Sequence, residues 1–402
     1  MVETQIGCVF FKRSCQCQVR ASGWISVPKL SFLSFVVFLS IIFFLGSGSQ
    51  SVFAQAGFRT ITDAFGRQVK VPKSVNHVIC SGAGCLRLLV YLRSHQKVVA
   101  VDTAETKKRF LDARPYALSN PQFKQYPVFG EFRGHDSPEL ILSLKTLPDV
   151  IFKAYSRVGD NPDELQNKTG IPVVAINYGN LGALRNDFYQ ALRIMGKVLA
   201  ENQRAEEVIT FFDFHIGDLN KRTVNIPDIR KKTCYIGGVA YRGPHGFQST
   251  EPAYPPFSMV NTVNVAFDPD KSPKELFHAD VSKEKIVEWN PELIFVDLST
   301  IQSDHKANAI YELKHGPVYQ SLHAVRQGEV YGLLPYNWYT KNFGSVIANA
   351  YYIGKVKYPK QFKDIDSREK ADEIYTFLVG KPVFQKMNRL FSNLIFTKLK
   401  LD

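Results

Sequence analysis

The 402-residue sequence contains none of the short motifs that mark the common hydrolase, metalloprotease and nucleotide-binding families. A GxSxG nucleophile elbow, an HExxH zinc motif and a P-loop are all missing. The six cysteines include no CxxC pair and no Cys/His spacing typical of structural zinc. We therefore predict a protein that is not an enzyme and that carries no resident cofactor or structural metal.

The positive charge of the chain is not concentrated in any run. The sequence holds 50 Lys and Arg against 37 Asp and Glu, a net charge of +13 at pH 7. It has no long basic segment and no basic stripe interleaved with aromatic residues, so nucleic acid is not an expected partner. A basic surface instead favours anionic ligands or an anionic surface.

The first 56 residues have the composition of a cleaved export signal. Residues 1–29 carry four basic residues and one acidic residue, and residues 30–45 follow without a charge. Small residues come next, with cleavage expected after Ala54 or Ala56. A retained anchor is the alternative, but this apolar run is short for a membrane span. No cysteine follows the run, which argues against a lipoprotein. We therefore expect a periplasmic protein. Removal of the signal takes away four basic residues and one acidic residue, so the net charge falls from +13 to about +10.

Cys80, Cys85 and Cys234 are the cysteines outside this leader. Cys80 and Cys85 are close enough in sequence to form a disulfide if a turn brings their Cα atoms to about 5.5 Å. Three buried free thiols are the alternative, and the sequence leaves both open.

A long amphipathic helix is predicted over residues 202–222, near the middle of the chain. Its apolar residues recur with the spacing of one helix face: Ala205, Val208, Ile209, Phe212, Ile216 and Leu219. Such a helix is about 30 Å long, enough to connect two lobes and to limit how far they hinge. An ordinary surface helix of one domain is the simpler alternative.

Strands and helices alternate on both sides of this helix, which predicts parallel βαβ units and an α/β fold. A hairpin is expected over residues 58–71. The other expected strands are 75–80, 98–101, 128–129, 149–152, 172–176, 234–236, 293–296 and 329–333. The expected helices are 86–92, 138–144, 163–168, 184–199, 283–289, 343–356 and 371–378.

Two segments repeat the same pattern, one on each side of the long helix. Residues 137–152 (SPELILSLKTLPDVIF) and 282–295 (SKEKIVEWNPELIF) share a serine cap, a glutamate, an isoleucine and a following Pro-acid-apolar strand. The shared register predicts two related lobes.

These segments resemble the class III periplasmic binding proteins of ABC importers, the family for ferric siderophores, haem and cobalamin. The resemblance rests on TDAFGRQVKVP in the hairpin, GKVLAENQRAEEVI at the entry to the long helix, and GPVYQSLHAVRQGEVY. YPKQFKDID and ADEIYTFLVG extend it toward the C-terminus, so that it covers about residues 58–380. It implies two αβ lobes with central, mostly parallel sheets, joined by one long rigid helix, with the ligand cleft between them.

The resemblance also implies a domain organisation and a partner. The expected division is a signal peptide (1–56), an N-terminal lobe (57–201), a linking helix (202–223) and a C-terminal lobe (224–402). We expect a monomer that delivers its ligand to an ABC permease in the inner membrane. In the family a glutamate on each lobe docks the permease, and Glu139 and Glu284 stand at the matching positions. A glutamate in the first turn of a helix also stabilises the helix dipole, which is the simpler explanation.

The expected cleft loops follow the carboxyl ends of the strands, where open α/β sheets bind ligands. These loops are rich in arginines, which pair with anions, and in aromatic rings, which stack on planar groups. The candidate ligand-binding residues are Ser81, Arg133, His135, Tyr155, Arg157, Tyr241, Arg242, His245, Tyr336, Trp338 and Tyr339, with Lys341 in the same loops.

This composition favours an anionic metal chelate, and we expect a compound of the ferric siderophore type. Haem and cobalamin are alternatives, because these ligands differ in the cleft shape they need rather than in motif. A bare Zn²⁺ or Mn²⁺ held by His135, His245 and Asp297 is a further alternative. The arginines beside these histidines argue against it, since they would repel a bare cation.

Overall fold

The computed structural model describes residues 57–155, 159–227, 231–268, 276–303 and 308–401. The predicted signal peptide and the candidate Arg157 lie outside these residues. Within the described part of the chain, no helix has the length and apolar character needed to cross a membrane.

The described chain begins with the predicted hairpin. β1 (Phe58–Thr62) pairs antiparallel with β2 (Gln68–Pro72). The turn between them contains Gly66 with a φ of 76°, a conformation that glycine adopts without steric cost.

Two three-stranded sheets form in residues 78–176, one of them wholly parallel and the other mixed. One has the order β3-β7-β8, and in the other β4 pairs parallel and β6 antiparallel with β5. The strands are β3 (Val78–Ser81), β4 (Val101–Asp102), β5 (Val128–Glu131), β6 (His135–Asp136), β7 (Val150–Ala154) and β8 (Val173–Ile176). The helices are α2 (Cys85–Tyr91), α3 (Thr103–Thr106), α4 (Pro115–Ser119), α5 (Pro138–Leu142), α6 (Pro162–Thr169) and α7 (Arg185–Leu199).

A four-stranded parallel sheet forms after residue 232, in the order β11-β9-β13-β14. A separate antiparallel pair joins β10 to β12. The strands are β9 (Thr233–Gly237), β10 (Ser249–Thr250), β11 (Val263–Asn264), β12 (Ala279–Asp280), β13 (Leu293–Asp297) and β14 (Val330–Leu333). The helices are α9 (Pro255–Met259), α10 (Lys283–Trp289), α11 (Ala309–His315), α12 (His323–Arg326), α13 (Phe343–Lys357), α14 (Ser367–Val379) and α15 (Phe384–Leu390).

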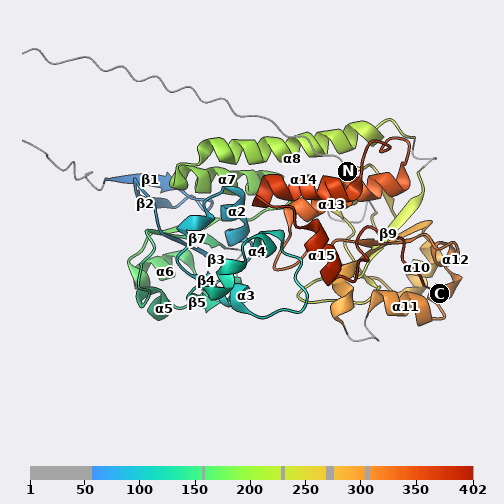
Figure 1. Cartoon of the computed structure of the whole chain (residues 1–402), viewed down its shortest axis with the longest axis horizontal. Coiled ribbons are helices and arrows are strands. Elements are labelled where there is room, and N and C mark those ends of the chain that lie inside the picture. Colours follow the sequence, from blue (N-terminus) through green and yellow to red (C-terminus); the bar gives the residue numbers. More distant parts are fainter. Residues whose placement is uncertain (1–56, 156–158, 228–230, 269–275, 304–307, 402) are drawn as a thin grey trace, which may run out of the picture. The chain divides into compact units, whose positions relative to one another are not determined.

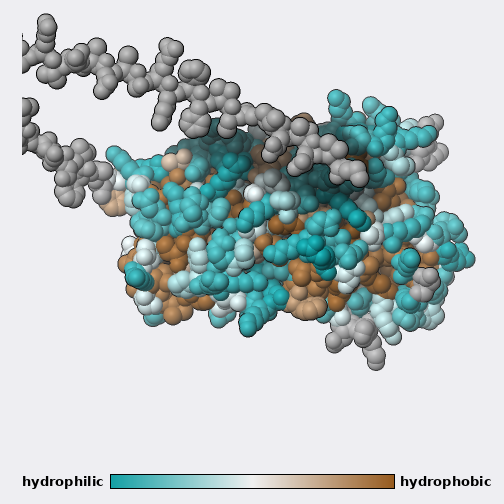
Figure 2. Space-filling model, in the orientation of Figure 1, coloured by the Kyte–Doolittle hydropathy of each residue, from teal (hydrophilic) through white to brown (hydrophobic). Residues whose placement is uncertain are grey.

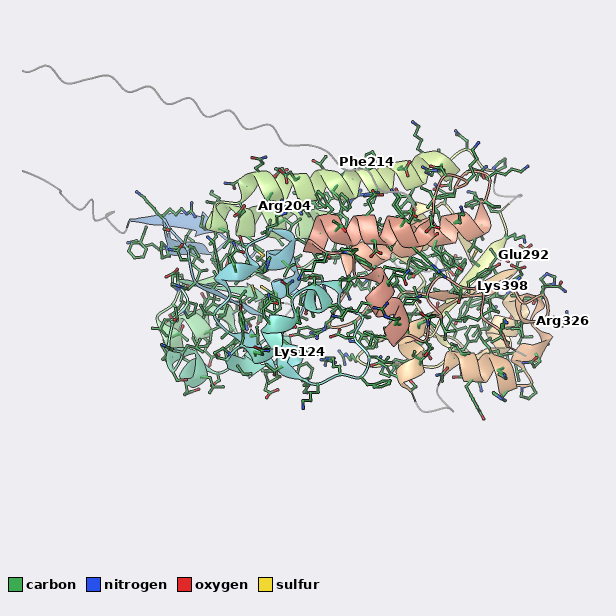
Figure 3. The ribbon with its side chains drawn as sticks, in the orientation of Figure 1. Lys124, Arg204, Phe214, Glu292, Arg326 and Lys398 are labelled. Carbon is green, nitrogen blue, oxygen red and sulfur yellow. The ribbon has the colours of Figure 1, made fainter. Side chains whose placement is uncertain are left out.

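The predicted long helix is α8 (Asn202–Thr223), one residue longer than expected. It packs against α7 on the N-terminal side and against α9 and α13 on the C-terminal side, as Figure 1 shows for α7 and α13. Arg204, labelled in Figure 3, anchors it by donating to the carbonyls of Tyr91 (2.9 Å) and Phe377 (2.6 Å). The predicted α/β class, with mostly parallel sheets before and after one long helix in the sequence, is confirmed.

The last helices pack against the first part of the chain. α14 contacts α2 and α4, and α15 contacts α4. Phe343, at the start of α13, stacks on Tyr178 with ring centroids 4.8 Å apart and lies 4.2 Å from Phe188. The predicted lobes, divided at residues 201 and 223, did not include these contacts between the two ends of the chain. The lobe boundaries stay a prediction.

Both copies of the repeated segment begin with a serine cap, as predicted. The Oγ atom of Ser137 accepts the N–H of Leu140, and that of Ser282 accepts the N–H of Lys285, both at 3.2 Å. These bonds satisfy N–H groups that a helix leaves unpaired at its start.

Cys80, Cys85 and Cys234 are free and buried, which excludes the Cys80–Cys85 disulfide. Burial raises the pKa of the Cys80 thiol well above its ordinary value, so this thiol stays protonated.

The surface drawn in Figure 2 is mostly hydrophilic, with apolar patches between the polar side chains. Three leucines in and after α5 are among the exposed apolar residues of the described chain: Leu140 (45% exposed), Leu142 (48%) and Leu147 (47%). Leu140 directly follows Glu139 in the sequence.

Candidate functional site

The site is built around a turn of the C-terminal lobe, residues 336–342. Side chains from the N-terminal lobe hold this turn through hydrogen bonds. The buried guanidinium of Arg87, on α2, donates to the carbonyls of Lys341 (2.8 Å), Trp338 (3.3 Å) and Tyr339 (3.1 Å). The hydroxyl of Tyr178 also donates to the Lys341 carbonyl, at 2.6 Å. We call residues 336–342 the cleft turn.

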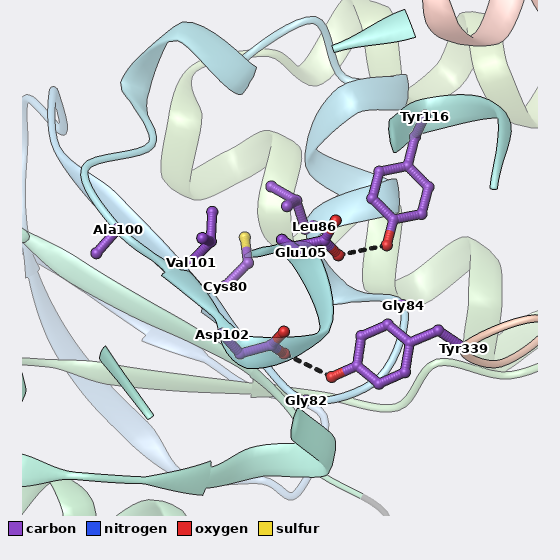
Figure 4. A pocket seen from close by; sticks show the side chains of 10 residues that line it. All are labelled: Cys80, Gly82, Gly84, Leu86, Ala100, Val101, Asp102, Glu105, Tyr116 and Tyr339. Atoms are coloured by element: carbon purple, nitrogen blue, oxygen red, sulfur yellow. Dashed lines mark hydrogen bonds between the residues drawn. The ribbon is translucent and has the colours of Figure 1, made fainter. Parts of the chain in front are cut away.

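Tyr339 ties the tip of the cleft turn to the N-terminal lobe. Its hydroxyl donates to Asp102 Oδ2 at 2.5 Å and accepts the backbone N–H of Arg133 at 3.0 Å. Figure 4 shows the hydrogen bond from Tyr339 to Asp102 beside a second one, from Tyr116 to Glu105 at 2.6 Å. The crevice between these side chains has no space that a water molecule could occupy.

Asp102 is about half protonated at neutral pH in this setting. Burial, and then the nearby charge of Glu105, raise its pKa to about 7, although bonds from Tyr339 and from the N–H of Ala104 oppose the rise. The bond between Asp102 and Tyr339 therefore joins the lobes through a carboxyl group that carries only part of a negative charge at pH 7.

The cleft turn also contacts the loop over residues 237–247. Asn337 Nδ2 donates to the carbonyl of Ala240 at 2.6 Å, directly before Tyr241. The ammonium of Lys341 pairs with the buried carboxylate of Glu251 at 2.9 Å, and so is not free for a ligand. Arg133 and the Ala240–Tyr241 segment thus adjoin the same turn, one from each lobe.

The predicted ligand-binding residues separate into exposed and buried groups. Arg133, His135, Tyr241 and Arg242 are exposed, and Tyr155, His245 and Tyr339 are half-buried. The three that are buried contact protein: Ser81 accepts from Lys153 Nζ at 3.0 Å, Tyr336 packs on Tyr254, and Trp338 packs on Phe391.

The two exposed arginines share a backbone conformation. Arg133 has a φ of 64° and Arg242 a φ of 56°, in the left-handed region that non-glycine residues rarely adopt. Residues held in this way cluster at ligand-binding loops. The arginine ion pairs among the described residues include neither Arg133 nor Arg242; they involve Arg67, Arg114, Arg193, Arg204 and Arg222.

Beside Arg242 lies an imidazole cluster that the sequence did not reveal. His278 stacks on Tyr241 with centroids 4.2 Å apart and planes at 10°, and the His245 ring lies 5.5 Å from His278. Asp297, expected to share a cation with His245, is fully buried, and its Oδ1 accepts the N–H of Ser299 at 2.8 Å. The structure groups His245 with His278 and Asp280 instead.

The two predicted docking glutamates lie in equivalent exposed positions. Glu139 is in the first turn of α5, and Glu284 is in the first turn of α10. Glu139 has its pKa lowered by a hydrogen bond from its own backbone N–H and by the hydroxyl of Ser137, which donates at 3.0 Å. It is therefore ionised at neutral pH.

A family model for periplasmic binding proteins matches residues 78–336, which is more than half of the chain. The chain is a member of this periplasmic binding protein family. The resemblance seen in the sequence is confirmed, and this family membership identifies a periplasmic solute-binding protein of the kind that serves ABC transporters.

Similar proteins include binders of different ligands. The molybdate-binding protein MolA of Haemophilus influenzae is 23% identical over 348 residues, covering 80% of this chain and 91% of MolA. A crystal structure of a periplasmic solute-binding protein from Veillonella parvula superimposes with a TM-score of 0.65 at 19% identity, covering 85% of this chain and 98% of that one. The petrobactin-binding protein YclQ of Bacillus subtilis gives 0.51 at 17% identity, covering 77% and 98%. At these identities the structural matches establish the fold alone.

Proposed function

We propose that the protein captures an anionic metal compound at the cleft turn and delivers it to an ABC permease. Arg133 approaches from the N-terminal lobe, and Tyr241, Arg242 and His245 approach from the C-terminal lobe. The observation that carries the proposal is that these two loops adjoin one turn from opposite lobes. The compound we favour is an iron chelate of the siderophore type.

The side chains at this place suit an anion. The guanidinium groups of Arg133 and Arg242 are exposed and lie over the rings of Phe132 and Tyr241, at 5.1 and 5.4 Å from the ring centroids. A guanidinium fork binds carboxylate, catecholate or oxyanion oxygens through charge-assisted hydrogen bonds, and a ring beside it can stack on a planar ligand. The net positive charge of the chain acts in the same direction.

A second candidate is a small tetrahedral oxyanion such as molybdate. Two observations favour it: the similarity to MolA along most of its length, and the tight contact between the cleft turn and α2. A compact anion needs less space between the lobes than a siderophore does. Both candidates rely on the same arginines, so direct binding measurements have to distinguish them.

The first experiment is a titration of the purified protein by intrinsic fluorescence and calorimetry. The panel contains a ferric catecholate, a ferric hydroxamate, haem, cobalamin, molybdate, and free Zn²⁺ and Mn²⁺. Saturation by a ferric chelate supports the proposal, and saturation by molybdate alone supports the second candidate. Binding of free cations and of no anion would overturn both.

The arginines are tested by Arg133→Ala and Arg242→Ala. A charge-assisted hydrogen bond contributes about 1.5–3 kcal/mol, so each variant should bind the saturating anion on the order of tenfold more weakly or worse. Arg326→Ala, an exposed arginine on α12, is the matched control and should bind like the parent. Unchanged affinity in both site variants would remove the arginines from the site.

A further inference from the structure

The pairing of two short strands brings three metal-binding side chains together in the C-terminal lobe. β10 pairs with β12 in a register that places Ser249 opposite Asp280. His278 directly precedes β12, and His245 lies four residues before β10. One ligand atom from each of His245, His278 and Asp280 lies within 4.8 Å of the other two. We propose that these three residues bind a divalent transition-metal ion.

The spacing between His278 and Asp280 fits two ligands of one ion. His278 Nε2 and Asp280 Oδ1 are 3.6 Å apart, which is too long for a hydrogen bond between them. Two ligands at about 2.1 Å from a tetrahedral zinc ion lie roughly 3.4 Å from each other. An ion can therefore join these two atoms with a movement of a few tenths of an ångström.

The surroundings of His245 have the pattern found around metal-bound histidines. Its Nε2 lies 2.7 Å from the carbonyl of Tyr241, which can only accept, so Nε2 carries the proton. This tautomer leaves a lone pair on Nδ1 for a metal. A hydrogen bond from the second ring nitrogen to a backbone carbonyl is a common way to orient such a ligand.

His278 is held on two sides. Its ring stacks on Tyr241, and its Nε2 lies 3.1 Å from Ser249 Oγ. Ser249 Oγ donates to the carbonyl of Val239 at 2.7 Å, so it accepts the Nε2 proton of His278 when no metal is bound. An ion that binds Nε2 replaces this hydrogen bond, and the ring keeps its single proton by carrying it on Nδ1 instead.

The ligand set defines the class of ion. Two imidazole nitrogens and one carboxylate oxygen suit Zn²⁺, Ni²⁺ or Cu²⁺ better than Mg²⁺ or Ca²⁺. The Asp280 side chain is 63% exposed, so an ion can enter from solvent and keep a water molecule as a further ligand. All three ligands belong to one lobe, and binding therefore requires neither lobe closure nor the anion discussed above.

A substitution of Arg242 separates the two proposals, because they predict opposite effects on binding. Its guanidinium lies over the Tyr241 ring, the same ring that stacks on His278. A positive charge beside the ring that stacks on His278 disfavours a bound cation. Arg242→Gln should therefore strengthen metal binding severalfold, whereas under the proposed function it weakens anion binding. The two proposals consequently fail in different measurements.

The deciding experiment is a calorimetric titration of the purified protein with zinc chloride in a non-chelating buffer that contains neither oxyanions nor metal chelates. We expect one equivalent to bind, and Co²⁺ at the same site to give a visible absorption band of tetrahedral intensity. Loss of an outer-shell partner alone weakens metal affinity by about 10–100-fold, so His278→Ala and Asp280→Asn should each cost at least about tenfold. His77→Ala, which alters an exposed histidine 3.8 Å from Asp149, is the matched control and should bind zinc like the parent.

Several outcomes would overturn the site. They are the absence of a zinc equivalent, unchanged affinity in both ligand variants, or an equal loss in His77→Ala. The metal-free thermal midpoint of each variant identifies a folding defect. Asp280→Asn keeps the proposal testable if His278→Ala does not fold, because the Asp280 side chain is mostly exposed.

Discussion

Two buried aspartates have pKa values far above the ordinary value for a carboxyl group. Asp102, beneath Tyr339, and Asp297, at the end of β13, each have a pKa raised to about 7, chiefly by burial. Between about pH 4 and pH 7 the unfolded chain loses these protons while the folded protein keeps them. The free energy of unfolding should therefore fall as the pH rises through this range.

Asp297→Asn tests this linkage. Asp297 Oδ1 accepts from Ser299, and Oδ2 has no hydrogen-bond partner among the described residues. An amide keeps the acceptor and cannot ionise, so the variant does not lose stability as the pH rises. Between pH 5 and pH 8 its free energy of unfolding should therefore improve by about 2–3 kcal/mol relative to that of the parent. Urea unfolding at the two pH values measures the difference.

Asp364→Asn is the control with the opposite sign. A hydrogen bond from Arg222 lowers the pKa of Asp364 to about 2, so its contribution to stability is present above pH 4 and is lost as the pH falls toward 2. The Asp364 side chain is 54% exposed, and removing its charge should cost less than about 1 kcal/mol at pH 8. If the free energy of unfolding changes between pH 5 and pH 8 by the same amount in Asp297→Asn as in the parent, Asp297 is not the source of the linkage.

Individual site residues could be predicted only where they follow a recognisable strand. Arg133 and Arg242 were placed in cleft loops because the strands before them have a clear apolar pattern, and both are exposed loop residues. His278 was missed because β10 and β12 are two residues long and carry no periodicity. Trp338 was expected to face the cleft, but its ring packs on Phe391, a partner 53 residues away that no local pattern identifies.

At the scale of single elements, α8 shows what an amphipathic pattern does and does not determine. The predicted helix starts at the residue where α8 starts, because one apolar face runs its full length. Arg204 and His215 are also buried in it, although their side chains are polar. Their partners come from distant elements, such as Tyr351 for His215 at 2.9 Å, and the pattern contains no information about these.

Arg204→Met tests how firmly α8 is anchored. The change removes the two hydrogen bonds to Tyr91 and Phe377 and the contact of the guanidinium with the Phe377 ring, 4.2 Å from its centroid. Two carbonyls lose a donor, so the free energy of unfolding should fall by about 2–4 kcal/mol. Chemical denaturation at pH 7 measures the loss.

Arg193→Met is the comparison on α7. The Arg193 side chain is 43% exposed and pairs with Glu206 of α8 at 2.7 Å. Exposed ion pairs contribute about 0–1 kcal/mol, so this variant should remain close to the parent. Equal losses in both variants would mean that α8 is not held chiefly by Arg204.

For the whole molecule, the sequence predicted two αβ parts because each part repeats a capped helix and a strand that can be recognised locally. It did not predict that α14 and α15 pack against α2 and α4, or that Arg87 holds the cleft turn. The bond from Arg87 to Lys341 joins residues 254 positions apart, and neither residue is unusual in its own segment. Contacts of this kind follow from tertiary packing, and they are what bring the predicted ligand loops to one place.

The proposed transfer of ligand to a permease requires a docking surface outside the ligand site. Glu139 and Glu284 occupy equivalent first-turn positions on α5 and α10, and the exposed Leu140 and Leu142 follow Glu139 on α5. Carboxylates beside apolar surface suit a partner that presents arginines. A charge-assisted bond contributes about 1.5–3 kcal/mol, so each alanine variant should weaken docking on the order of tenfold.

Uptake into proteoliposomes that contain the permease, together with ligand titration of the free protein, separates docking from binding. Glu139→Ala and Glu284→Ala should reduce uptake, and the double variant more than either, while ligand affinity stays at the parent value. Glu164→Ala is the control, because Glu164 occupies the first turn of α6 but pairs with Lys168 at 2.6 Å. If uptake survives the double variant, these glutamates serve only to cap their helices. If ligand affinity falls with uptake, the two surfaces are not separate, and docking and capture have to be assigned to the same residues.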